Sequence, residues 1–294
     1  MGHQDKLAAA VAEQVASNRS GIDHGAADTF AEHRARLTQE IVARAPADGR
    51  GRLCLLGSGN AHDVELDALA ARFAEIHLVD IDAEAVERAL SGVPAPARGR
   101  FTAHAPLDVS GVFDQLEGWS RKPPRPEDVR DLVPATAARV VAALPAPFDV
   151  VVSCSLLTQL QLVLLQVVGD QNPRFDDLRT AVNRIHVRTL GGALAPGGVA
   201  LLVTDLTSND IYPPLSWLEP GVDLAALMGD LVHAGHVIHV AHPGLLSAEL
   251  RRDPALKQTY AVHFPVGPWL WHNGATQTYL VYGLEITRRP EPGR

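Results

Sequence analysis

The strongest constraint on the fold is a strand–turn–helix–strand pattern in the first third of the chain. Residues 53–82 read LCLLGSGNAHDVELDALAARFAEIHLVDID. The pattern predicts a strand at 52–57, a helix at 62–74 and a second strand at 76–80, with Gly57 and Gly59 in the turn between strand and helix. Strands that alternate with helices in this way are typical of a parallel, doubly wound α/β sheet.

The same alternation continues to the end of the chain. The run PFDVVVSCS (147–155) is nearly all apolar, which suits a central parallel strand that is buried on both faces. Further strands are expected at 100–105, within 194–205, near 259–264 and at 276–287. Further helices are expected at 82–91 with Asp82 as N-cap, and at 127–143, 156–168, 174–191 and 223–234. The predicted fold class is α/β, with a mostly parallel sheet of the seven-stranded type and helices on both faces.

The N-terminal residues precede the first strand. Helical patterns cover 5–16 and 26–45, and the turn-rich stretch SNRSGIDHGA lies between them. We therefore expect residues 1–48 to form a helical extension, or a cap over a site, and residues 49–294 to form one Rossmann-like domain.

Composition excludes several classes of protein. Of the 294 residues, 46% are hydrophobic and 20% are charged, as in soluble globular proteins, and no apolar run is long enough to predict a membrane span. The two cysteines lie in strand-like runs, which favours a reducing, cytoplasmic location. The net charge is −8 and the basic residues are scattered, so we do not expect a nucleic-acid partner.

The glycine loop departs from a dinucleotide fingerprint. G-x-G-x-x-G would need glycine at position 62, where this chain has His62. Asp80, at the end of the next strand, is placed to accept both hydroxyls of a ribose, although it could instead cap the next helix. Two glycines and a distal acid suit a ligand that contains adenosine but no pyrophosphate.

Five segments together resemble a known family: GSGNAHDVEL, HLVDID, LDVSG, FDVVVSCS and LAPGGVALLVTD. In order and spacing they are similar to the class I S-adenosylmethionine-dependent methyltransferases over roughly residues 50–205. The resemblance implies S-adenosylmethionine as cofactor and methyl transfer to oxygen or nitrogen of a small-molecule acceptor. The alternatives are a non-catalytic sensor or scaffold that binds this cofactor, and an NAD(P)-dependent oxidoreductase. His62 and the lack of a Tyr-x-x-x-Lys pair disfavour the oxidoreductase.

The resemblance also implies roles for individual residues. The loop residues Gly57, Ser58 and Gly59 would lie against the methionine and ribose parts of the cofactor. Asp80 would bind the ribose with Ile81 beside it, Leu107 and Asp108 would meet the adenine, and Ser153 and Cys154 would lie near the methyl donor. Cys154 also reads as a small buried hydrophobic residue.

Two positions depart from the family pattern. Leu55 stands where an acid is common, and Ala61 where a third glycine is common. We hypothesise that Asp63 supplies the missing carboxylate for the methionine end; its other role would be that of an acid in the first turn of a helix.

The acceptor side is less defined by sequence. In-line methyl transfer depends on positioning, so no catalytic triad is expected. The substrate-binding candidates are Gln159, Tyr212 and Trp269, and the weak catalytic candidates are Asp205 and His272. Each also has a structural reading, as a helix-surface, loop-capping or packing residue. Ser153-Cys154-Ser155-Leu156 differs from the Asn/Asp-Pro-Pro-Tyr/Phe motif of enzymes that methylate amino groups of DNA bases.

Four histidines recur at intervals of three in LVHAGHVIHVAHP, at positions 233, 236, 239 and 242. Gly235 and the β-branched VIHV run predict that a helix ends here and a strand follows, which sends alternate side chains to opposite faces. We therefore expect no metal site. The sequence leaves open whether the protein is a monomer or a homodimer.

Overall fold

The computed structural model describes residues 6–10, 12–13, 16 and 29–289. The predicted hinge SNRSGIDHGA lies outside the described residues, as do parts of both predicted N-terminal helices. The described strands are β1 (Arg52–Leu56), β2 (Glu75–Val79), β3 (Phe101–His104), β4 (Phe148–Cys154), β5 (Leu194–Ser208), β6 (Tyr260–Asn273) and β7 (Gln277–Arg288).

Helices and short 3₁₀ turns connect these strands. The helices are α3 (Ala31–Val42), α4 (Leu66–Ala70), α5 (Ala83–Ser91), α6 (Ala95–Arg98), α7 (Phe113–Arg121), α8 (Pro126–Ala142), α9 (Leu156–Val168), α10 (Phe175–Gly192), α11 (Leu224–Ala234), α12 (Pro243–Arg252) and α13 (Pro254–Thr259). The 3₁₀ turns are η1 (Pro213–Trp217) and η2 (His239–Ala241).

The seven strands form one sheet in the order β3-β2-β1-β4-β5-β7-β6. The pairs among β1 to β5 are parallel, and β7 runs antiparallel to both β5 and β6. The order reverses between β1 and β4, so the carboxyl ends of these two strands flank a topological switch point. Ligands of open α/β sheets bind at such a point. The predicted doubly wound sheet is therefore confirmed, and the C-terminal strands complete it.

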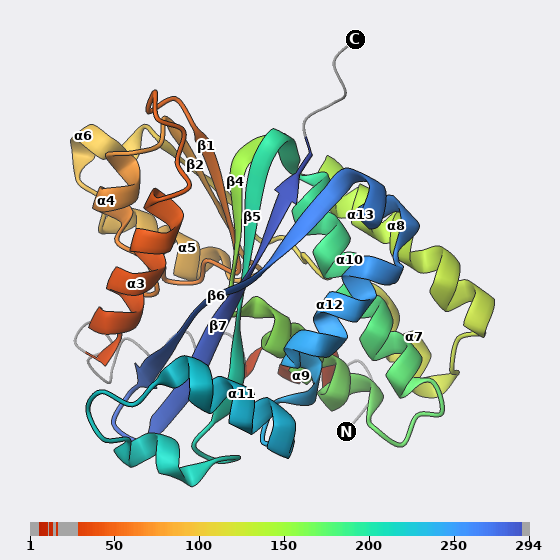
Figure 1. Cartoon of the computed structure of the whole chain (residues 1–294). Helices are drawn as coiled ribbons and strands as arrows, with labels where there is room; N and C mark the ends of the chain where they lie inside the picture. The colour runs from red at the N-terminus through yellow and green to blue at the C-terminus, as the bar shows by residue number, and fades with distance from the viewer. Residues whose placement is uncertain (1–5, 11, 14–15, 17–28, 290–294) are drawn as a thin grey trace.

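Helices cover both faces of the sheet (Figure 1). On one side lie α3, α4, α5 and α6; on the other lie α7, α8, α9, α10, α12 and α13. Because successive residues of a strand face opposite sides, the core divides into two clusters. Val151 and Leu202 belong to the cluster on the α9–α10 side, whereas Val152 and Leu201 belong to the cluster on the α3–α4 side.

Three local predictions need correction. The helix predicted at 62–74 is only α4, because the chain makes a turn at Ala61, whose φ is +55°, before the helix begins at Leu66. Helix α7 (Phe113–Arg121) is not among the predicted helices. The strand predicted near 259–264 extends to Asn273 and has irregular register between His263 and Trp269.

The strand predicted after Gly235 is wrong. Gly235 ends α11 with φ of +77°, as expected for a helix C-terminus, but the next residues form the 3₁₀ turn η2 and then α12. Helix α12 begins because His242 caps it: His242 Nδ1 accepts from the Gly244 backbone N–H at 3.0 Å, and Pro243 takes the first helical position.

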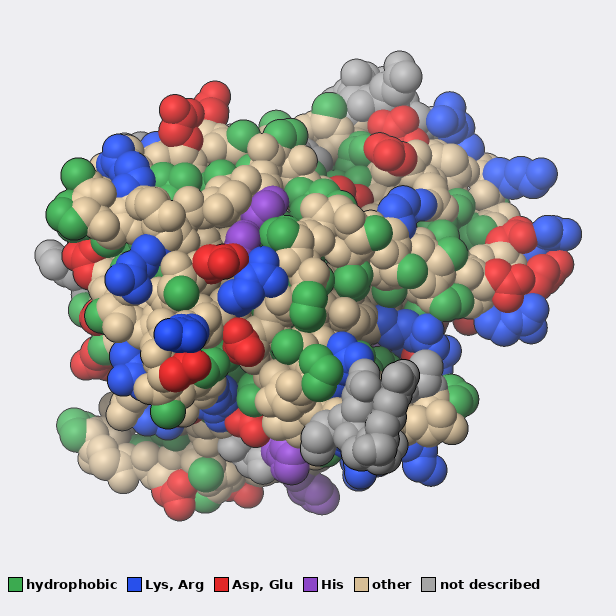
Figure 2. Space-filling model, turned by 90° about the horizontal axis from the view of Figure 1, so that it is seen from above, with side chains coloured by type: hydrophobic (Ala, Val, Ile, Leu, Met, Phe, Trp, Pro, Cys, Tyr) green, Lys and Arg blue, Asp and Glu red, His purple; other side chains and the backbone are tan. Residues whose placement is uncertain are grey.

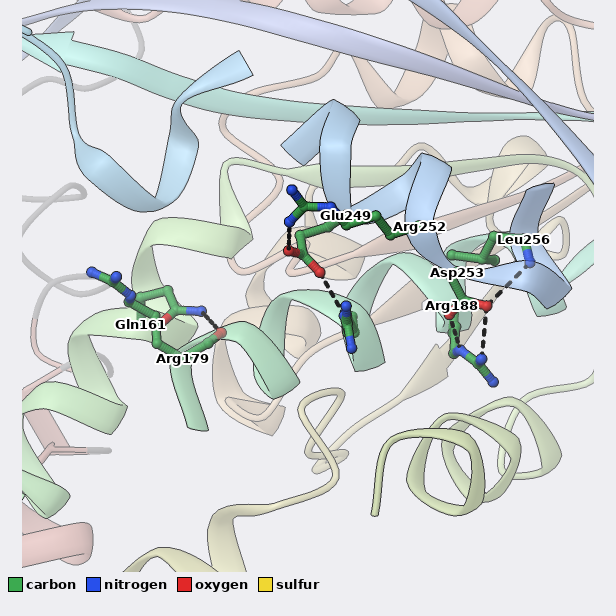
Figure 3. Close-up of polar contacts among 8 residues, drawn as sticks. Gln161, Arg179, Arg188, Glu249, Arg252, Asp253 and Leu256 are labelled. Atoms are coloured by element: carbon green, nitrogen blue, oxygen red, sulfur yellow. Dashed lines mark hydrogen bonds and ion pairs between the residues drawn. The ribbon is translucent and has the colours of Figure 1, made fainter. Parts of the chain in front are cut away.

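Ion pairs fasten α12 and the turn after it to α10 (Figure 3). Arg184 Nε donates to Glu249 Oε2 at 2.5 Å, and Arg188 makes a bidentate contact with Asp253 at 2.5 and 2.8 Å. The side chain of Asp253 is only 4% exposed. These ion pairs hold α12 and the start of α13, two helices that the sequence did not predict, against α10.

The surface carries charges of both signs. Lys, Arg, Asp and Glu side chains are interspersed over the face seen in Figure 2, with no single basic stripe on that face. In the described part of the chain, no helix combines the length and apolar character needed to cross a bilayer. The same residues contain no group of three or more His, Cys, Asp or Glu placed to hold a metal ion.

Candidate functional site

A cavity of about 480 Å³, which includes its mouth, lies beyond the carboxyl ends of β1 and β2. Six of the residues predicted as cofactor or substrate contacts line it: Gly57, Asp80, Ile81, Leu107, Asp108 and Gln159. The remaining lining residues are Val109, Phe113, Leu156, Leu160 and Val163.

The glycine loop brings its backbone close to this cavity. Gly57 has φ of +73°, and an added Cβ would lie 3.0 Å from Leu156 Cβ at the start of α9. Glycine is therefore required at position 57 both by backbone conformation and by space. The Gly57 and Ser58 backbone N–H groups donate to the Val79 carbonyl at 2.9 and 3.1 Å, which ties the loop to the end of β2.

Asp80 links the loop to the second strand. Its Oδ2 accepts from the Gly59 backbone N–H at 2.7 Å and its Oδ1 from the Asp82 backbone N–H at 2.8 Å. Burial raises the pKa of this carboxyl, and the backbone donors oppose that rise. The next helix is capped by Asp82, which accepts from the Ala85 backbone N–H at 3.0 Å, as predicted. Asp80 is therefore not needed for that cap.

Asp108 lies in the loop after β3 and organises the start of α7. Its Oδ1 accepts from the backbone N–H and the hydroxyl of Ser110, at 2.8 and 2.6 Å. Its Oδ2 accepts from the Phe113 backbone N–H at 3.0 Å. Since a carboxylate has about four acceptor positions, these contacts leave one position on Oδ2 unused.

The two residues predicted at the end of β4 face opposite sides of the sheet. Ser153 contacts α10, where its hydroxyl lies 2.8 Å from His186 Nε2, and it is not among the residues that line the cavity. Burial lowers the pKa of His186 to about 4, so this pair is a neutral contact inside the core. Cys154 belongs to the opposite cluster, and burial raises the pKa of its thiol well above the usual value.

The loop after Ala61 contacts α3 rather than the cavity. Arg34 Nε donates to the His62 carbonyl at 2.7 Å, and the His62 ring meets Phe30 edge-on at 6.1 Å. Asp63 Oδ1 lies 3.4 Å from His33 Nε2. Leu55 is a fully buried core residue on this same side of the sheet. The hypothesis that Asp63 holds the methionine end of a cofactor stays a prediction.

A second group of polar residues meets behind the loop. Asp205, at the end of β5, is 6% exposed, and its Oδ2 accepts from the Thr158 hydroxyl at 3.1 Å. Burial raises the pKa of Asp205 to about 6. Val281 of β7 pairs with Asp205 of β5 on one side and with Trp269 of β6 on the other. The Trp269 indole N–H donates to His33 Nδ1 at 3.0 Å.

The other acceptor-side candidates lie elsewhere. His272 follows Trp271 on β6, so its side chain faces the opposite side and is exposed; its Nδ1 is 3.2 Å from the Thr278 hydroxyl. Tyr212 lies near the loop before η1, with its ring 5.8 Å from that of His236. The structure thus separates these two residues from Asp205 and Trp269.

Sequence reasoning missed His33, Thr158 and Tyr279 as neighbours of Asp205. His33 comes from α3, and its place on the same helix face as the apolar Leu37 was the available signal. Thr158 precedes the predicted Gln159 by one residue, and the two side chains face different sites: Gln159 the cavity, Thr158 the Asp205 carboxylate.

The strand order and the cavity position decide the fold family. Five parallel strands reverse their order between β1 and β4, an antiparallel strand is inserted between β5 and the edge, and the predicted contact residues meet at the switch point. The fold is that of the class I S-adenosylmethionine-dependent methyltransferases.

Comparison with known proteins finds similar structures but no close sequence. No family model matches the chain, and no curated protein matches it. The N-methyltransferase NodS from Bradyrhizobium japonicum, solved with S-adenosylhomocysteine, is 12% identical with a TM-score of 0.41, over 86% of each chain.

Two further solved structures show the spread of this likeness. An S-adenosylmethionine-dependent methyltransferase from Mesorhizobium loti is 16% identical with a TM-score of 0.42, over 85% of this chain and 96% of that one. An rRNA methylase from Streptococcus thermophilus is 8% identical with a TM-score of 0.39, over 86% and 95%.

Proposed function

We propose that this protein is a cytoplasmic S-adenosylmethionine-dependent methyltransferase that acts on oxygen or nitrogen of a small-molecule acceptor. The observation that supports this most is the cavity at the switch point, where the Asp80 and Asp108 carboxylates and the Gly57 backbone line one space. Residues 1–48 act in this proposal as an extension or cap, and the assembly is a monomer or a homodimer.

The residues present fit the cofactor. Asp80 accepts backbone N–H groups from Gly59, Asp82 and Ile81, and since a carboxylate has about four acceptor positions it retains capacity for a hydroxyl group of a ribose. The open acceptor position on Asp108 Oδ2 suits the exocyclic amino group of adenine, and Ile81, Leu107 and Phe113 supply apolar contact for a ring.

When bound, the cofactor supplies an electrophilic methyl group. The protein's own task is to orient the acceptor and exclude water. The Gly57 turn and the start of α9 keep this end of the cavity narrow, since Leu156 packs directly against the turn. A base is needed only for an acceptor that arrives protonated.

The test is calorimetry of the purified protein with S-adenosylmethionine, S-adenosylhomocysteine and NAD. We expect the first two to bind and NAD not to bind. To assign the ribose contact, the 2′-deoxy analogue of S-adenosylhomocysteine is compared with the parent. Loss of one charge-assisted hydrogen bond predicts roughly tenfold weaker binding of the analogue to the wild-type protein.

The Asp80→Asn variant tests the ribose contact through the ratio of two affinities, for the parent and for its 2′-deoxy analogue. A general loss of stability or affinity changes both values and leaves the ratio unchanged. The introduced amide keeps one acceptor oxygen but carries no charge, so the preference for the 2′-hydroxyl should shrink to about threefold or less, whatever the absolute affinity. Glu84→Gln, at an exposed position on α5, is the matched control and should keep the full preference.

Other outcomes select the alternatives. Binding of NAD alone would replace the proposal with an oxidoreductase. Binding of S-adenosylhomocysteine without methyl transfer to any acceptor in a broad panel would favour a sensor or scaffold. Methyl transfer to RNA but not to small molecules would correct the acceptor class.

A further inference from the structure

Behind the glycine loop lies a buried group that we call the acid–aromatic cluster. It consists of Asp205, Asp63, His33, Trp271 and Tyr279. These residues come from the end of β5, the β1–α4 loop, α3, β6 and β7, and His33, Asp205 and Trp271 are all less than 9% exposed. The cavity described above does not include them. The cluster therefore needs an account of its own.

The cluster adjoins the cavity through the start of α9. Gln159 lines the cavity, and the preceding Thr158 donates to Asp205. Ser155, just before α9, has a φ of +45°, an unfavourable conformation for a residue with a Cβ. Such strain is concentrated at functional sites.

Hydrogen bonding orients the His33 ring. The Trp269 indole N–H can only donate, so His33 Nδ1 accepts. The other ring nitrogen, Nε2, lies on the side of Asp63. The distance of 3.4 Å between His33 Nε2 and Asp63 Oδ1 is too long for a strong hydrogen bond.

Both acids have buried oxygens that no described residue satisfies. Asp205 Oδ1 and Asp63 Oδ1 have no hydrogen-bond partner in the described part of the chain, and neither does Trp271 Nε1. The Thr158 hydroxyl donates to Oδ2 of Asp205, and the Ser155 hydroxyl is close enough to lower the pKa of this carboxyl. A buried carboxylate oxygen without a hydrogen-bond partner is costly, so the open Oδ1 atoms of Asp205 and Asp63 favour a ligand with several hydrogen-bond donors and a positive charge.

Aromatic rings form the rest of the cluster. Trp271 stacks on His33 with centroids 4.7 Å apart and an angle of 23°, and Tyr279 lies 5.2 Å from Trp271. Phe30 meets Trp271 edge-on at 5.3 Å. The face of an indole or phenol ring attracts a cation. Rings and carboxylates thus favour the same kind of ligand group.

We propose that the acid–aromatic cluster binds the protonated amino group of an amine, which makes an amine the acceptor class of this site. The assignment as acceptor rests on the proposed methyltransferase function, whereas the amine site itself does not. Asp205 takes one proton from the bound ammonium group onto a carboxyl oxygen. That leaves the nitrogen neutral with its lone pair free, which an ammonium ion lacks.

Three isosteric probes test the site without any nucleotide: phenethylamine, phenethyl alcohol and phenylacetate. Their binding is measured at neutral pH by calorimetry and by tryptophan fluorescence, because Trp269 and Trp271 are part of or contact the cluster. We expect phenethylamine to bind at least roughly tenfold more tightly than the alcohol, and phenylacetate to bind most weakly, since a charge-assisted hydrogen bond is about twice as strong as a neutral one.

Two variants test whether the preference for the amine over the alcohol depends on Asp205 and Asp63. Asp205→Asn should reduce the affinity for phenethylamine by roughly tenfold or more and leave that for phenethyl alcohol unchanged. Asp63→Asn is the second variant, in case the first does not fold, and should act in the same direction. Asp210→Asn, exposed in the loop after β5 and bonded to Gln277, is the control and should bind all three probes as the wild type does.

Three results would overturn the inference: no saturable binding of phenethylamine, equal affinity for the amine and the alcohol, or an unchanged amine preference in both variants. S-adenosylhomocysteine binding is measured in parallel on the same preparations. Amine binding without it would reject the proposed function and keep the amine site, and the reverse result would do the opposite.

Discussion

At the scale of single residues, strain and unpaired charge gather at one end of the sheet. The two non-glycine residues with positive φ in the described part of the chain are Ala61 and Ser155, which follow β1 and β4. Asp205 lies near the end of β5 and is buried with an unsatisfied oxygen. These departures from ordinary folding rules coincide with the switch point of the sheet, where the candidate site lies.

Ala61 allows the strain to be measured. Its φ of +55° is favourable for glycine, so Ala61→Gly should raise the free energy of unfolding by roughly 1 kcal/mol, as measured by urea denaturation. Ala68→Gly, within α4, is the control and should lower it by about 0.5–1 kcal/mol. Equal destabilisation by both substitutions would show that position 61 carries no backbone strain.

Asp205 makes stability depend on pH in a defined direction. Burial raises its pKa from 3.8 to about 6 in the folded protein, so the folded state holds this proton more tightly than the unfolded state. The free energy of unfolding therefore decreases as pH rises between these two values. At about 1.4 kcal/mol for each unit of pKa difference, the loss is at most about 3 kcal/mol.

Asp205→Asn should remove that decrease, so the variant gains stability relative to the wild type above pH 6. Denaturation midpoints at several pH values between 4 and 8 measure it. Asp210→Asn, whose carboxylate is exposed, should keep the wild-type pH profile. If the difference in stability between the wild type and Asp205→Asn does not change with pH, the raised pKa does not belong to Asp205.

At the scale of elements, helix α3, which precedes the predicted domain, is bound firmly to it. Helix α3 packs against β6 and α4, and its Thr38 hydroxyl accepts from the Glu65 backbone N–H at 2.8 Å just before α4 begins. Arg44, after α3, pairs with Glu285 of β7 at 2.6 Å. Helix α3 therefore contributes to the core, and it also delivers His33 to the cluster.

The contribution of α3 is testable by a cavity-forming substitution. Leu37 is fully buried between the helix and the sheet, so Leu37→Ala should lower the free energy of unfolding by about 2–4 kcal/mol in a single transition. Gln39→Ala, on the exposed face of the same helix, should change it by less than about 0.5 kcal/mol. A separate early transition would indicate that α3 is an independent appendage.

The clamp between α10 and the α12–α13 turn provides another element-scale test. Arg188→Ala leaves the nearly buried Asp253 carboxylate without its bidentate partner and should cost roughly 3 kcal/mol. Arg184→Ala removes a more exposed pair and should cost about 1 kcal/mol or less. Chemical denaturation measures both, and equal costs would contradict the role of burial.

At the scale of the whole molecule, the sheet separates two core clusters and the site joins them. The cavity is lined largely from the α7–α9 side, whereas the acid–aromatic cluster belongs to the α3–α4 side. They meet where β1 and β4 end. A ligand that occupies the cavity contacts β1, β2, the β3–α7 loop and α9 at once, so its binding should stabilise the fold as a unit.

This global coupling predicts a thermal shift. At about 100 times its dissociation constant, S-adenosylhomocysteine should add about 2.7 kcal/mol to the free energy of unfolding. For a domain of this size the melting temperature should rise by roughly 5–10 °C. Differential scanning calorimetry measures the shift, and NAD is the control ligand. A shift with NAD and none with S-adenosylhomocysteine would contradict the proposed cofactor.

The sequence by itself determined the class of sheet and most of the cavity. Buried parallel strands such as β4 are continuous apolar runs, and helices such as α9 have apolar periodicity, so both are legible in local sequence. Residues that follow such strands, including Gly57, Asp80 and Asp108, necessarily gather at one edge of the sheet. The local sequence pattern is therefore enough to predict the cavity residues that follow the ends of the strands.

Only the tertiary structure decided what lies beside that cavity. Helices α12 and α13 replace the strand predicted after Gly235, because a histidine cap and two ion pairs to α10 outweigh the β-branched local preference. His33 reaches Trp269 across 236 positions of sequence, and no local pattern encodes such a pairing. The position of His33 and the open oxygens of Asp205 and Asp63 depend on these long-range contacts, so the acid–aromatic cluster exists only in the folded chain.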